Sequence, residues 1–456
     1  MITSALAFLL TIGVLIVVHE YGHYRVAVAC GVKVLRFSIG FGRVVWRSQR
    51  HPGGTEFVLS SLPLGGYVRM LDEREGPVDS GELTHAFNRK PLWQRSAIVA
   101  AGPAANLLLA VLLYSASNWI GVDEPKALIG QPPPASLAER AGLRAGDWVQ
   151  AVSADGTSWR EVRSMTDLRW ELTRAALRSE PLQLSISDRA GHGQRTATLA
   201  LDAVAATEVD AELMRRIGIA QPYSEAVLGE VRPAGPAARA GLMAGDRVLS
   251  VDGRSIGDAA GLRQSIRAAV KGREPLAMHW RVERHGQTLS VDVVPVVASD
   301  NGQTIGRIEA FIGGPPQMVH VRYGAVAGLL QGTERTWDMS VLSLKMLGRM
   351  LIGQASLKNL SGPLTIADYA GQSVRLGVAY YLGFLAVVSI SLGVLNLLPL
   401  PMLDGGHLMY YLFEAVTRRP VSELWLDRLQ RGGVAVILIM MSLALYNDVA
   451  RLLGLQ

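Results

Sequence analysis

The chain has 456 residues, of which 49% are hydrophobic and 18% are charged. This composition is too apolar for an ordinary soluble protein of this length and predicts membrane segments. The formal net charge is +6, but no basic block or aromatic-interleaved basic patch accompanies it, so we expect no nucleic-acid partner. Cys30 is the only cysteine, which excludes an intrachain disulfide.

Four uncharged apolar stretches are candidate transmembrane helices: residues 1–18, 96–122, 376–403 and 432–447. The middle two exceed the roughly 20 residues needed to span a bilayer, and the outer two are near the lower limit. The first stretch could instead be a secretory signal peptide. It has no basic residue at its start and leads directly into ionisable residues, so we expect it to be retained.

Basic residues predict how these stretches are oriented in the membrane. The connection 31–95 carries ten lysines and arginines, and the connection before the last stretch carries four arginines, at positions 418, 419, 428 and 431. By the positive-inside tendency both connections face the cytoplasm. Both termini and the long middle region then lie on the opposite side of the membrane.

The middle region, residues 123–319, is polar enough to be soluble and contains an internal near-repeat. AGLRAGDWV (141–149) returns as AGLMAGDRV (240–248). Two copies predict two similar domains rather than a solenoid, and each copy is typical of a short helix, a tight turn and a strand. The pattern resembles PDZ domains of bacterial proteases, which bind extended peptides or C-termini at a sheet edge. Residues 216–219 are a candidate carboxylate-binding loop, and an unrelated small β-rich domain is the alternative.

Two further segments carry a periodic pattern. Between residues 320 and 375, apolar residues such as Val326, Trp337 and Leu347 recur at helical spacing. They predict an amphipathic helix that lies in the membrane interface or packs on the spanning helices. Near the N-terminus, residues 37–42 and 56–60 are typical of short strands with glycine bends.

Residues 19–23 read His-Glu-Tyr-Gly-His, which is the HExxH pattern. On a helix both histidines lie on one face, where they can bind one zinc ion, and Glu20 can act on the attacking water. The pattern also occurs by chance on solvated helices. Here it continues an apolar stretch, where ionisable side chains are costly and mark function. We therefore expect His19 and His23 to bind a metal.

A catalytic zinc site needs a third protein ligand. The extended HExxHxxGxxH pattern is absent, because Val26 and Ala29 occupy its glycine and third-histidine positions. Near the end of the third apolar stretch, NLLPLPMLDGGH (396–407) places Asp404 just after two prolines that should break the helix. An isolated buried aspartate is costly, whereas beside a divalent cation it is neutralised. Asp404 is the favoured third ligand, and His407 is the alternative.

HEYGH near the N-terminus, NLLPLPMLDGGH near the C-terminus and the tandem PDZ-like repeats between them resemble the site-2 protease family of intramembrane zinc metalloproteases. The resemblance covers essentially the whole chain. It implies one zinc ion per chain, with His19, His23 and Asp404 as ligands and Glu20 as the catalytic acid/base. It also implies four substrate-binding residues, which are Asn396, Pro399, Pro401 and Asn359. Residues 31–71 then correspond to the membrane-associated β element of that family.

The resemblance further implies a function. The expected substrates are transmembrane segments of single-span membrane proteins that another protease has already trimmed, such as an anti-sigma factor in an envelope stress response, and also signal-peptide remnants. We expect a bacterial inner-membrane protein with its repeats and both termini outside the cytoplasm and its active site toward the cytoplasm. A non-catalytic scaffold and a metal transporter are the alternatives, but neither requires Glu20 beside the metal.

The predicted fold is a polytopic α-helical membrane protein with four transmembrane helices and two inserted β-rich PDZ-like domains. The predicted segments are the first transmembrane helix with HExxH (1–30), a cytoplasmic membrane-associated β element (31–95), the second transmembrane helix (96–122), PDZ-like domain 1 (123–210), PDZ-like domain 2 (211–305), an amphipathic helix with a connecting segment (320–375), the third transmembrane segment (376–410) and the fourth transmembrane helix (430–453).

Overall fold

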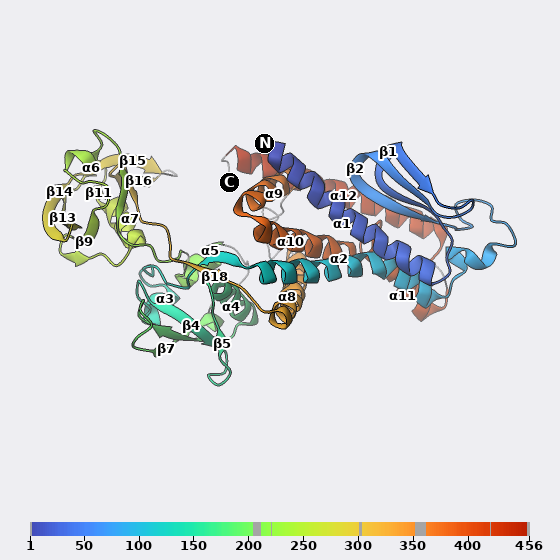
Figure 1. Ribbon diagram of the computed structural model, residues 1–456, viewed down its shortest axis with the longest axis horizontal. Coiled ribbons are helices and arrows are strands. Elements are labelled where there is room, and N and C mark those ends of the chain that lie inside the picture. Colours follow the sequence, from blue (N-terminus) through green and yellow to red (C-terminus); the bar gives the residue numbers. More distant parts are fainter. Residues whose placement is uncertain are drawn as a thin grey trace. The chain divides into compact units, whose positions relative to one another are not determined.

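The computed structural model describes residues 2–203, 211–219, 221–300, 303–351, 362–419 and 421–453. The chain divides into two compact units, one made of Met1–Val122 with Arg322–Gln456 and the other of Asp123–Val321. The first unit is mainly helical and the second is rich in β-strands (Figure 1). Asn359, one of the expected substrate-binding residues, lies outside the described residues.

The helical unit contains the helices that could cross a membrane. Its helices are α1 (Ile2–Ala29), α2 (Leu92–Ile120), α8 (Ala325–Leu351), α9 (Pro363–Leu376), α10 (Val378–Asn396), α11 (Asp404–Thr417) and α12 (Glu423–Leu452). By length and composition, four of the described helices are candidate spans: α1, α2, α10 and most of α12. They coincide with the four predicted apolar stretches, although α12 begins earlier than predicted and includes Arg428 and Arg431. The chain is therefore a membrane protein by composition and by helix length.

Helix α2 is the centre of this unit, because α1, α8 and α10 all pack against it (Figure 1). Buried residues of α2 and α10 form a common apolar core. Small residues allow close contact with α1: a Cβ atom on Gly22 would lie 2.4 Å from the carbonyl oxygen of Ala101. Close packing of small residues is the usual basis of helix association in membranes. It brings the HExxH turn of α1 against α2.

The break predicted from the two prolines lies between α10 and α11. Helix α10 ends at Asn396 and α11 begins at Asp404. The intervening residues fold back on the start of α11, since a Cβ atom on Gly405 would lie 2.2 Å from the carbonyl oxygen of Leu398. Met402 in this loop has a φ of 83°, a strained conformation for a bulky residue that is held only by its surroundings. Asp404 is thereby fixed at the first turn of α11.

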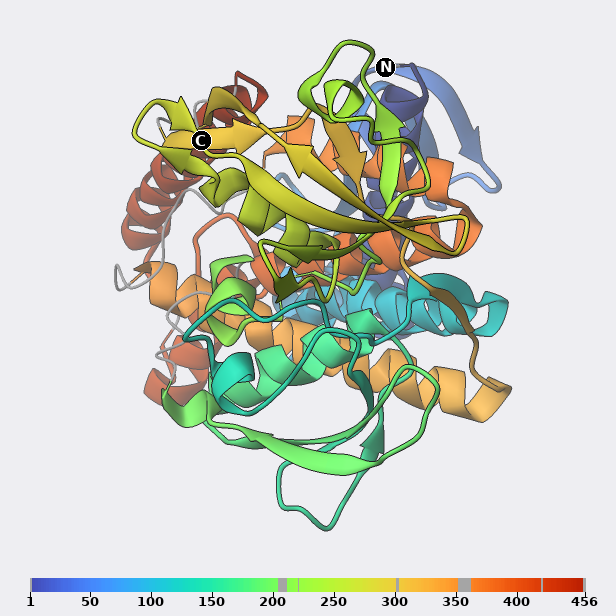
Figure 2. The same ribbon diagram turned by 90° about the vertical axis from the view of Figure 1, so that its left-hand side faces the viewer.

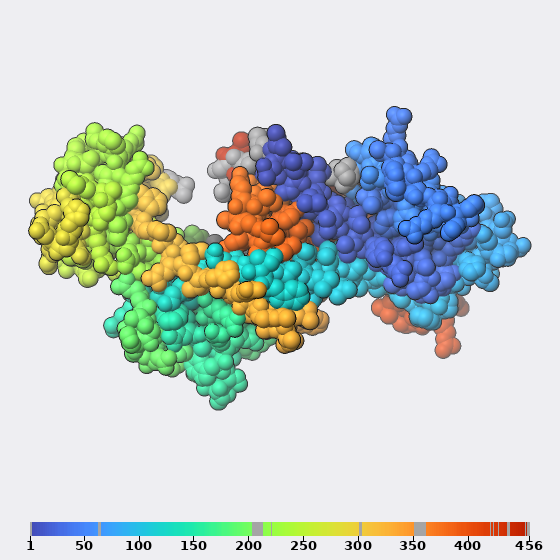
Figure 3. All heavy atoms as spheres, in the orientation of Figure 1, coloured from blue at the N-terminus to red at the C-terminus, as the bar shows by residue number. Residues whose placement is uncertain are grey.

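The β element follows α1. It consists of β1 (Val34–Gln49) and β2 (Glu56–Met70), which are longer than the two predicted strands. Residues 36–39 pair with residues 56–59 on one side and with residues 66–69 on the other. Aromatic contacts join the element to Tyr24 of α1, and Figure 3 shows its light-blue surface beside that of α1. Two short 3-10 turns, η1 (Leu83–His85) and η2 (Phe87–Arg89), then lead to α2.

After the amphipathic helix, which the structure forms as α8, lies a helix that the sequence analysis placed in a connecting segment. This helix, α9, starts at Pro363. Asp448 of α12 caps it, because its carboxylate accepts hydrogen bonds from the backbone N–H groups of Gly362 at 2.9 Å, Leu364 at 2.9 Å and Thr365 at 3.1 Å. A buried carboxylate at a helix N-terminus is stabilised by the unpaired N–H groups there. Asp448 therefore ties α12 to α9.

The second unit contains two four-stranded sheets of the same strand order, and Figure 2 shows the strands of this unit in green and yellow. The first sheet has the order β5-β4-β6-β7, with β4 (Trp148–Ser153), β5 (Arg160–Glu161), β6 (Leu182–Ser187) and β7 (Arg195–Leu199). The second has the order β10-β9-β13-β14, with β9 (Arg247–Val251), β10 (Arg254–Ser255), β13 (Met278–Arg284) and β14 (Gln287–Val293). The near-repeat in the sequence thus corresponds to two similar β-rich domains.

Further elements complete the two domains. The helices are α3 (Leu137–Arg140), α4 (Met165–Arg178), η3 (Leu201–Ala203), α5 (Ala211–Ile217), α6 (Pro236–Arg239) and α7 (Ala259–Ala268). Short paired strands are β3 (Val122–Pro125) with β18 (Met318–Val321), β8 (Leu228–Val231) with β17 (Ala310–Ile312), β11 (Val270–Lys271) with β12 (Glu274–Pro275), and β15 (Val296–Asp300) with β16 (Gln303–Arg307). Helices α4 and α7 occupy equivalent places in the two repeats.

The repeated AGxxAGD segment forms the same turn in both domains. Its glycines have positive φ, for example 87° at Gly146 and 91° at Gly245, which glycine adopts at little cost. The aspartate closes the turn in each copy, since Asp246 accepts a hydrogen bond from the backbone N–H of Met243 at 2.8 Å. Asp246 also pairs with Arg284 of β13 at 2.6 Å. The repeat is therefore a turn that requires these residue types.

The core of each domain extends beyond the range expected for it. Leu213, Ile217 and Ile219 belong to the core of the first domain, although the expected boundary placed them in the second. Leu213 and Ile217 do so because the apolar side of α5 packs into the first core, and Ile219 follows this helix closely. In the same way Ile308 belongs to the second core, beyond the expected end at residue 305. Residues 216–219, the candidate carboxylate-binding loop of the second repeat, thus lie in the first domain.

Candidate metal centre

Three side chains from distant parts of the chain converge at one point of the helical unit. His19 and His23 lie on α1, and Asp404 lies at the start of α11. The Nε2 atoms of His19 and His23 are 3.2 Å apart. The Oδ2 atom of Asp404 lies 3.2 Å from Nε2 of His19 and 3.6 Å from Nε2 of His23, and these three side chains are only 11%, 12% and 19% exposed.

These separations fit a zinc ion. Zinc bonds of about 2.0–2.1 Å in tetrahedral geometry place neighbouring ligand atoms about 3.3 Å apart. The Oδ2 atom of Asp404 is buried and has no hydrogen-bond partner among the described residues, although a buried, unpaired carboxylate oxygen is costly. A metal ion bound between the three atoms satisfies it. Three protein ligands also leave the fourth position for water, as in catalytic zinc sites.

Helix α2 orients both histidines. The Nδ1 atom of His23 lies 2.8 Å from the carbonyl oxygen of Ile98, and Nδ1 of His19 lies 3.2 Å from the side-chain amide of Asn106. With Nδ1 engaged in this way, each imidazole presents Nε2 toward Asp404. Ligating histidines in proteins are commonly held by such a contact on the second ring nitrogen. The sequence analysis missed Asn106, yet an amide inside an apolar helix is itself a functional signal.

Of the two alternatives for the third ligand, Asp404 is the one that lies together with His19 and His23. Among the described residues, the one group of three or more histidine, cysteine or acidic side chains that could hold a metal ion is His19, His23 and Asp404, whose ligand atoms all lie within 4.8 Å of one another. His407 is not part of that group. It lies one turn along α11 and lines the same cavity, and its ring makes an edge contact with Tyr410.

A cavity of about 460 Å³ opens beside the three ligands and is lined by α1, β2, the loop after β2 and the start of α11. Glu20 and Asn396 lie in its wall. Gly66 of β2 leaves room for Glu20, because a Cβ atom there would lie 2.9 Å from Glu20 Cγ. Pro399 and Pro401 lie in the loop before Asp404 and are not among the lining residues. The β element therefore forms one side of the cavity.

A second acidic residue in the cavity wall is neutralised by an arginine. Arg74 donates to Asp72 through Nε at 2.9 Å and through its terminal nitrogen at 2.5 Å. Burial raises the pKa of Asp72, but the hydrogen bonds from Arg74 outweigh it and hold this pKa below its ordinary value. Asp72 thus stays ionised and paired. Glu75 in the same wall is paired with Arg69 at 3.0 Å, which leaves Glu20 as the carboxylate next to His19 and His23.

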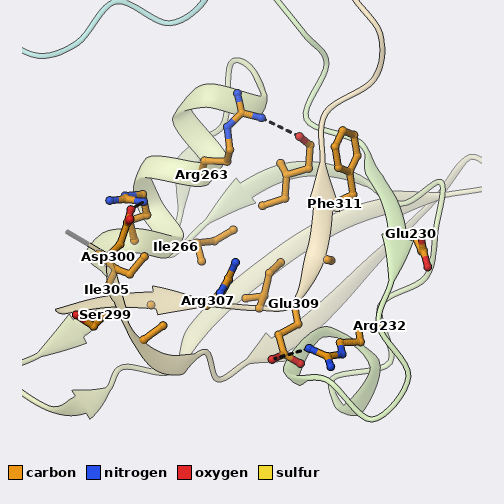
Figure 4. Close-up of a pocket in the computed structure, with 16 residues that line it drawn as sticks. Glu230, Arg232, Arg263, Ile266, Ser299, Asp300, Ile305, Arg307, Glu309 and Phe311 are labelled. Carbon is orange, nitrogen blue, oxygen red and sulfur yellow. Dashed lines mark hydrogen bonds and ion pairs between the residues drawn. The ribbon is translucent and has the colours of Figure 1, made fainter. Parts of the chain in front are cut away.

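The second β-rich domain has a groove of about 770 Å³ between α7 and the strands β16 and β17 (Figure 4). Ile266 of α7 and Ile305 of β16 give it an apolar floor, and Arg263, Arg267 and Arg307 stand around it. Arg263 crosses to β17 and donates to the carbonyl oxygen of Ile312 at 2.8 Å. Gly306 lets β16 approach α7, since a Cβ atom there would lie 2.2 Å from the carbonyl oxygen of Ile266.

Apolar helices that carry two histidines, an aspartate and a neighbouring glutamate define a membrane-bound metallohydrolase site. Comparison with known proteins agrees. The profile of peptidase family M50 matches residues 7–440. The chain is 41% identical to a protein of Ralstonia nicotianae that is named as a zinc metalloprotease, over 98% of each chain. It is 39% identical to the regulator of sigma-E protease RseP of Salmonella typhimurium and 37% identical to that of Escherichia coli, again over 98% of each chain.

The chain therefore belongs to peptidase family M50, the site-2 proteases, and is a zinc metalloprotease. The expected family and enzyme class are confirmed. The four candidate membrane helices agree with proteolysis in the membrane.

Proposed function

We propose that this protein cleaves transmembrane segments of single-span membrane proteins, inside or at the edge of the bilayer. One zinc ion per chain is bound by His19, His23 and Asp404. The observation that carries the proposal is that these ligand atoms lie within 4.8 Å of one another, with both histidines on the candidate membrane helix α1 and Asp404 at the start of α11, shortly after the candidate membrane helix α10. Charged and polar residues at such a depth are costly and are kept for function.

The chemistry is divided between the metal and the chain. When bound, zinc polarises the scissile carbonyl group and makes water a better nucleophile. Glu20 accepts a proton from the attacking water and passes it to the leaving amine. Its place on the turn between the two histidine ligands, and in the cavity wall, suits this role. The loop after α10 holds Asp404 in position, and α2 holds the two histidines.

A substrate helix must unwind before its backbone can reach this site, because all its backbone hydrogen bonds are internal. Strand β2 passes beside Glu20 at Gly66 and offers an edge to which an extended segment can pair. Asn396 lines the cavity, and the loop with Pro399 and Pro401 interrupts the helix next to it. These residues, together with Asn359, are assigned to substrate binding.

The membrane setting follows from charge and from exposed apolar side chains. The β element and the basic connections face the cytoplasm of a bacterium whose inner membrane holds the protein, and both termini and the β-rich domains lie outside. Val45 and Trp46 of β1 are 69% and 56% exposed, and α8 exposes Val326 and Trp337. Side chains of this kind bury themselves in the interfacial region of a bilayer.

The two β-rich domains act as PDZ-like modules for peptides or C-termini. In the second domain, the groove between α7 and β17 has an apolar floor with Arg263 and Arg307 beside it, while Arg267 is paired with Asp300 at 2.7 Å. This surface suits an extended chain ending in an apolar residue and a carboxylate. Strand β17 pairs with β8 through Ala310 and Ile312. The carboxylate of such a chain would then bind near Gly306 of β16, and not at residues 216–219.

The physiological substrate is an anti-sigma factor in an envelope stress response, which this protein cuts after another protease has trimmed it. Two curated relatives carry the name regulator of sigma-E protease, which supports this assignment. Signal-peptide remnants are a further substrate class, since they are also short membrane helices without a large external domain.

Cleavage of a single-span substrate by the purified protein in detergent tests the proposal. We expect cleavage that stops when a zinc chelator is added and returns when zinc is restored. The Glu20→Gln variant serves as control, because it should stay inactive with zinc present. Cleavage that survives complete removal of zinc would refute the proposed mechanism.

A further inference from the structure

Asn106 of α2 is a polar residue in an apolar helix that no step of the mechanism uses. Asn106 is completely buried, with 0% of its surface exposed. Its side-chain amide nitrogen lies 3.2 Å from Nδ1 of His19. Its side-chain oxygen is buried and has no hydrogen-bond partner among the described residues. The backbone carbonyl of Asn106 accepts a hydrogen bond from Ser389 of α10 at 2.7 Å, so the helix is fixed at this residue.

An unpaired buried amide is costly, and an apolar residue of similar size would avoid that cost. Packing alone therefore does not account for an asparagine at this position. Among the described residues, the hydrogen-bond partner of its side chain is His19, a residue of the proposed metal centre. The asparagine side chain is best explained by its hydrogen bond with the imidazole of His19.

The chemistry of His19 decides which end of the amide faces it. His19 directs Nε2 toward Asp404 Oδ2, at 3.2 Å. A neutral imidazole that binds a metal through Nε2 carries its proton on Nδ1 and needs an acceptor there. The NH₂ group of an amide cannot accept a hydrogen bond. Since the O and N positions of an asparagine amide are assigned from its hydrogen bonds, the side-chain oxygen is the atom that faces His19.

His23 shows the same arrangement with a different acceptor, because its Nδ1 lies 2.8 Å from the carbonyl oxygen of Ile98. Ile98 and Asn106 are two turns apart on one face of α2. One face of this helix thus supplies an acceptor to each histidine ligand. The acceptor for His23 belongs to the backbone, whereas the acceptor for His19 is a side chain and can be changed by mutation.

We propose that Asn106 is a positioning residue of the metal centre: its side-chain oxygen accepts a hydrogen bond from Nδ1–H of His19 and fixes the tautomer and ring orientation in which Nε2 binds the metal. This inference rests on the proposed zinc site. It assigns to α2 a direct part in metal affinity that the HExxH motif and Asp404 do not reveal.

Zinc affinity of the full-length protein in detergent, measured by competition with a chromophoric chelator, tests the proposal. Asn106→Leu keeps the branched shape and the number of side-chain heavy atoms and removes the acceptor, so affinity should fall about 10- to 100-fold, as for other orienting partners of ligating histidines. Asn106→Asp keeps an acceptor oxygen in the same place and should remain within about threefold of the wild type. The visible spectrum of the Co²⁺ form should change in Asn106→Leu and stay unchanged in Asn106→Asp.

Ser389→Ala is the matched control, because it removes the hydrogen bond to the Asn106 backbone and leaves the amide side chain in place. It should bind zinc like the wild type. Wild-type zinc affinity and an unchanged Co²⁺ spectrum in Asn106→Leu would overturn the proposal, as would equal losses in the leucine and aspartate variants. A wild-type chain that binds no zinc at all would instead refute the proposed metal centre.

Discussion

Gly102 of α2 lies directly against the imidazole of His23: a Cβ atom on Gly102 would stand 2.2 Å from Nε2 of His23. Real Cβ atoms do not approach another atom so closely, and the atom concerned here is the one directed at the metal. The glycine is thus a requirement of the proposed metal centre, since any side chain at position 102 displaces the imidazole of His23. Ile98, Gly102 and Asn106 lie at intervals of four residues and form one wall of the site.

Gly102→Ala should therefore abolish cleavage and lower zinc affinity at least about tenfold, as expected when a ligand is displaced. In an unobstructed helix interior the same change would stabilise the protein by about 0.5–1 kcal/mol. Gly13→Ala in α1 is the matched control, because no atom lies within 4 Å of a Cβ atom there. Zinc content and cleavage of both variants check the prediction. Normal zinc binding by Gly102→Ala would contradict the observed contact.

Glu20→Gln should separate chemistry from metal binding. Because Glu20 acts as a base and is not a ligand, cleavage should fall by about 100- to 10,000-fold, the range for loss of a general acid/base, while zinc stays at one per chain. Asp404→Ala should lower both cleavage and zinc content. Elemental analysis of the purified variants provides the measurement. Full zinc retention in Asp404→Ala would remove Asp404 as third ligand and favour His407.

The membrane orientation can be tested with single cysteines, since the chain has one natural cysteine. In a Cys30→Ser background, cysteines in place of Arg47 and Arg419 should react with a membrane-impermeant reagent only after the cytoplasmic side is opened. A cysteine in place of His192, in the first β-rich domain, should react from outside. Labelling of all three positions from the same side would rule out the proposed four-span orientation.

The ion pair between Asp246 and Arg284 should stabilise the second β-rich domain in a pH-dependent manner. Burial raises the pKa of Asp246, but hydrogen bonds from Arg284 and from the Met243 backbone outweigh it, so this pKa lies below its ordinary value. A lowered folded-state pKa means that the stabilisation is complete above the unfolded value of about 3.9 and is lost as the pH falls through the folded value. The protection of β9 and β13 amides against hydrogen exchange should therefore be complete above the unfolded value and should decrease as the pH falls through the folded value.

Substitution gives a second measurement of the same pair. Asp246→Asn should reduce the stability of this domain by about 1–3 kcal/mol near neutral pH, because Arg284 loses charge-assisted hydrogen bonds. Asp292→Asn, which weakens the exposed pair with His279, is the control and should change stability by less than about 1 kcal/mol. Equal losses of stability in the two variants would show that burial of Asp246 does not increase the contribution of its ion pair to stability.

Much of this architecture could be predicted because its signals are local. The HExxH turn, the prolines that end α10 and the repeated AGxxAGD turn each depend on a few consecutive residues, and the structure forms each of them. The candidate spans followed from hydropathy alone. By contrast, Asn106 and Gly102 gain their roles only from the rotation of α2 against α1, which no pattern within α2 determines.

The other differences have the same origin. Helix α9 was not predicted because its cap, Asp448, lies on α12, far along the sequence. Leu213 and Ile217 were placed in the second domain because sequence order suggested it, whereas their apolar side chains are buried in the first core. In each case a contact between distant segments, rather than local propensity, decides the outcome.

The last prediction is that the two β-rich domains filter access to the active site and take no part in its chemistry. Every residue assigned to the chemistry lies in the helical unit, and the β-rich domains form a separate compact unit between α2 and α8. Folded domains there can exclude substrates with large external domains by their bulk, whereas trimmed substrates pass.

Deletion of residues 126–317, with a short linker in their place, keeps β3 and β18, which pair with each other, and so preserves the connection from α2 to α8. The deleted protein should bind zinc normally and should cleave an untrimmed substrate that the full-length chain rejects. Cleavage of a trimmed substrate, measured in parallel with zinc content, controls for damage to α8. If the deleted protein cuts the trimmed substrate at the normal rate and still rejects the untrimmed one, the β-rich domains are not the filter, and selection by size must arise within the helical unit itself.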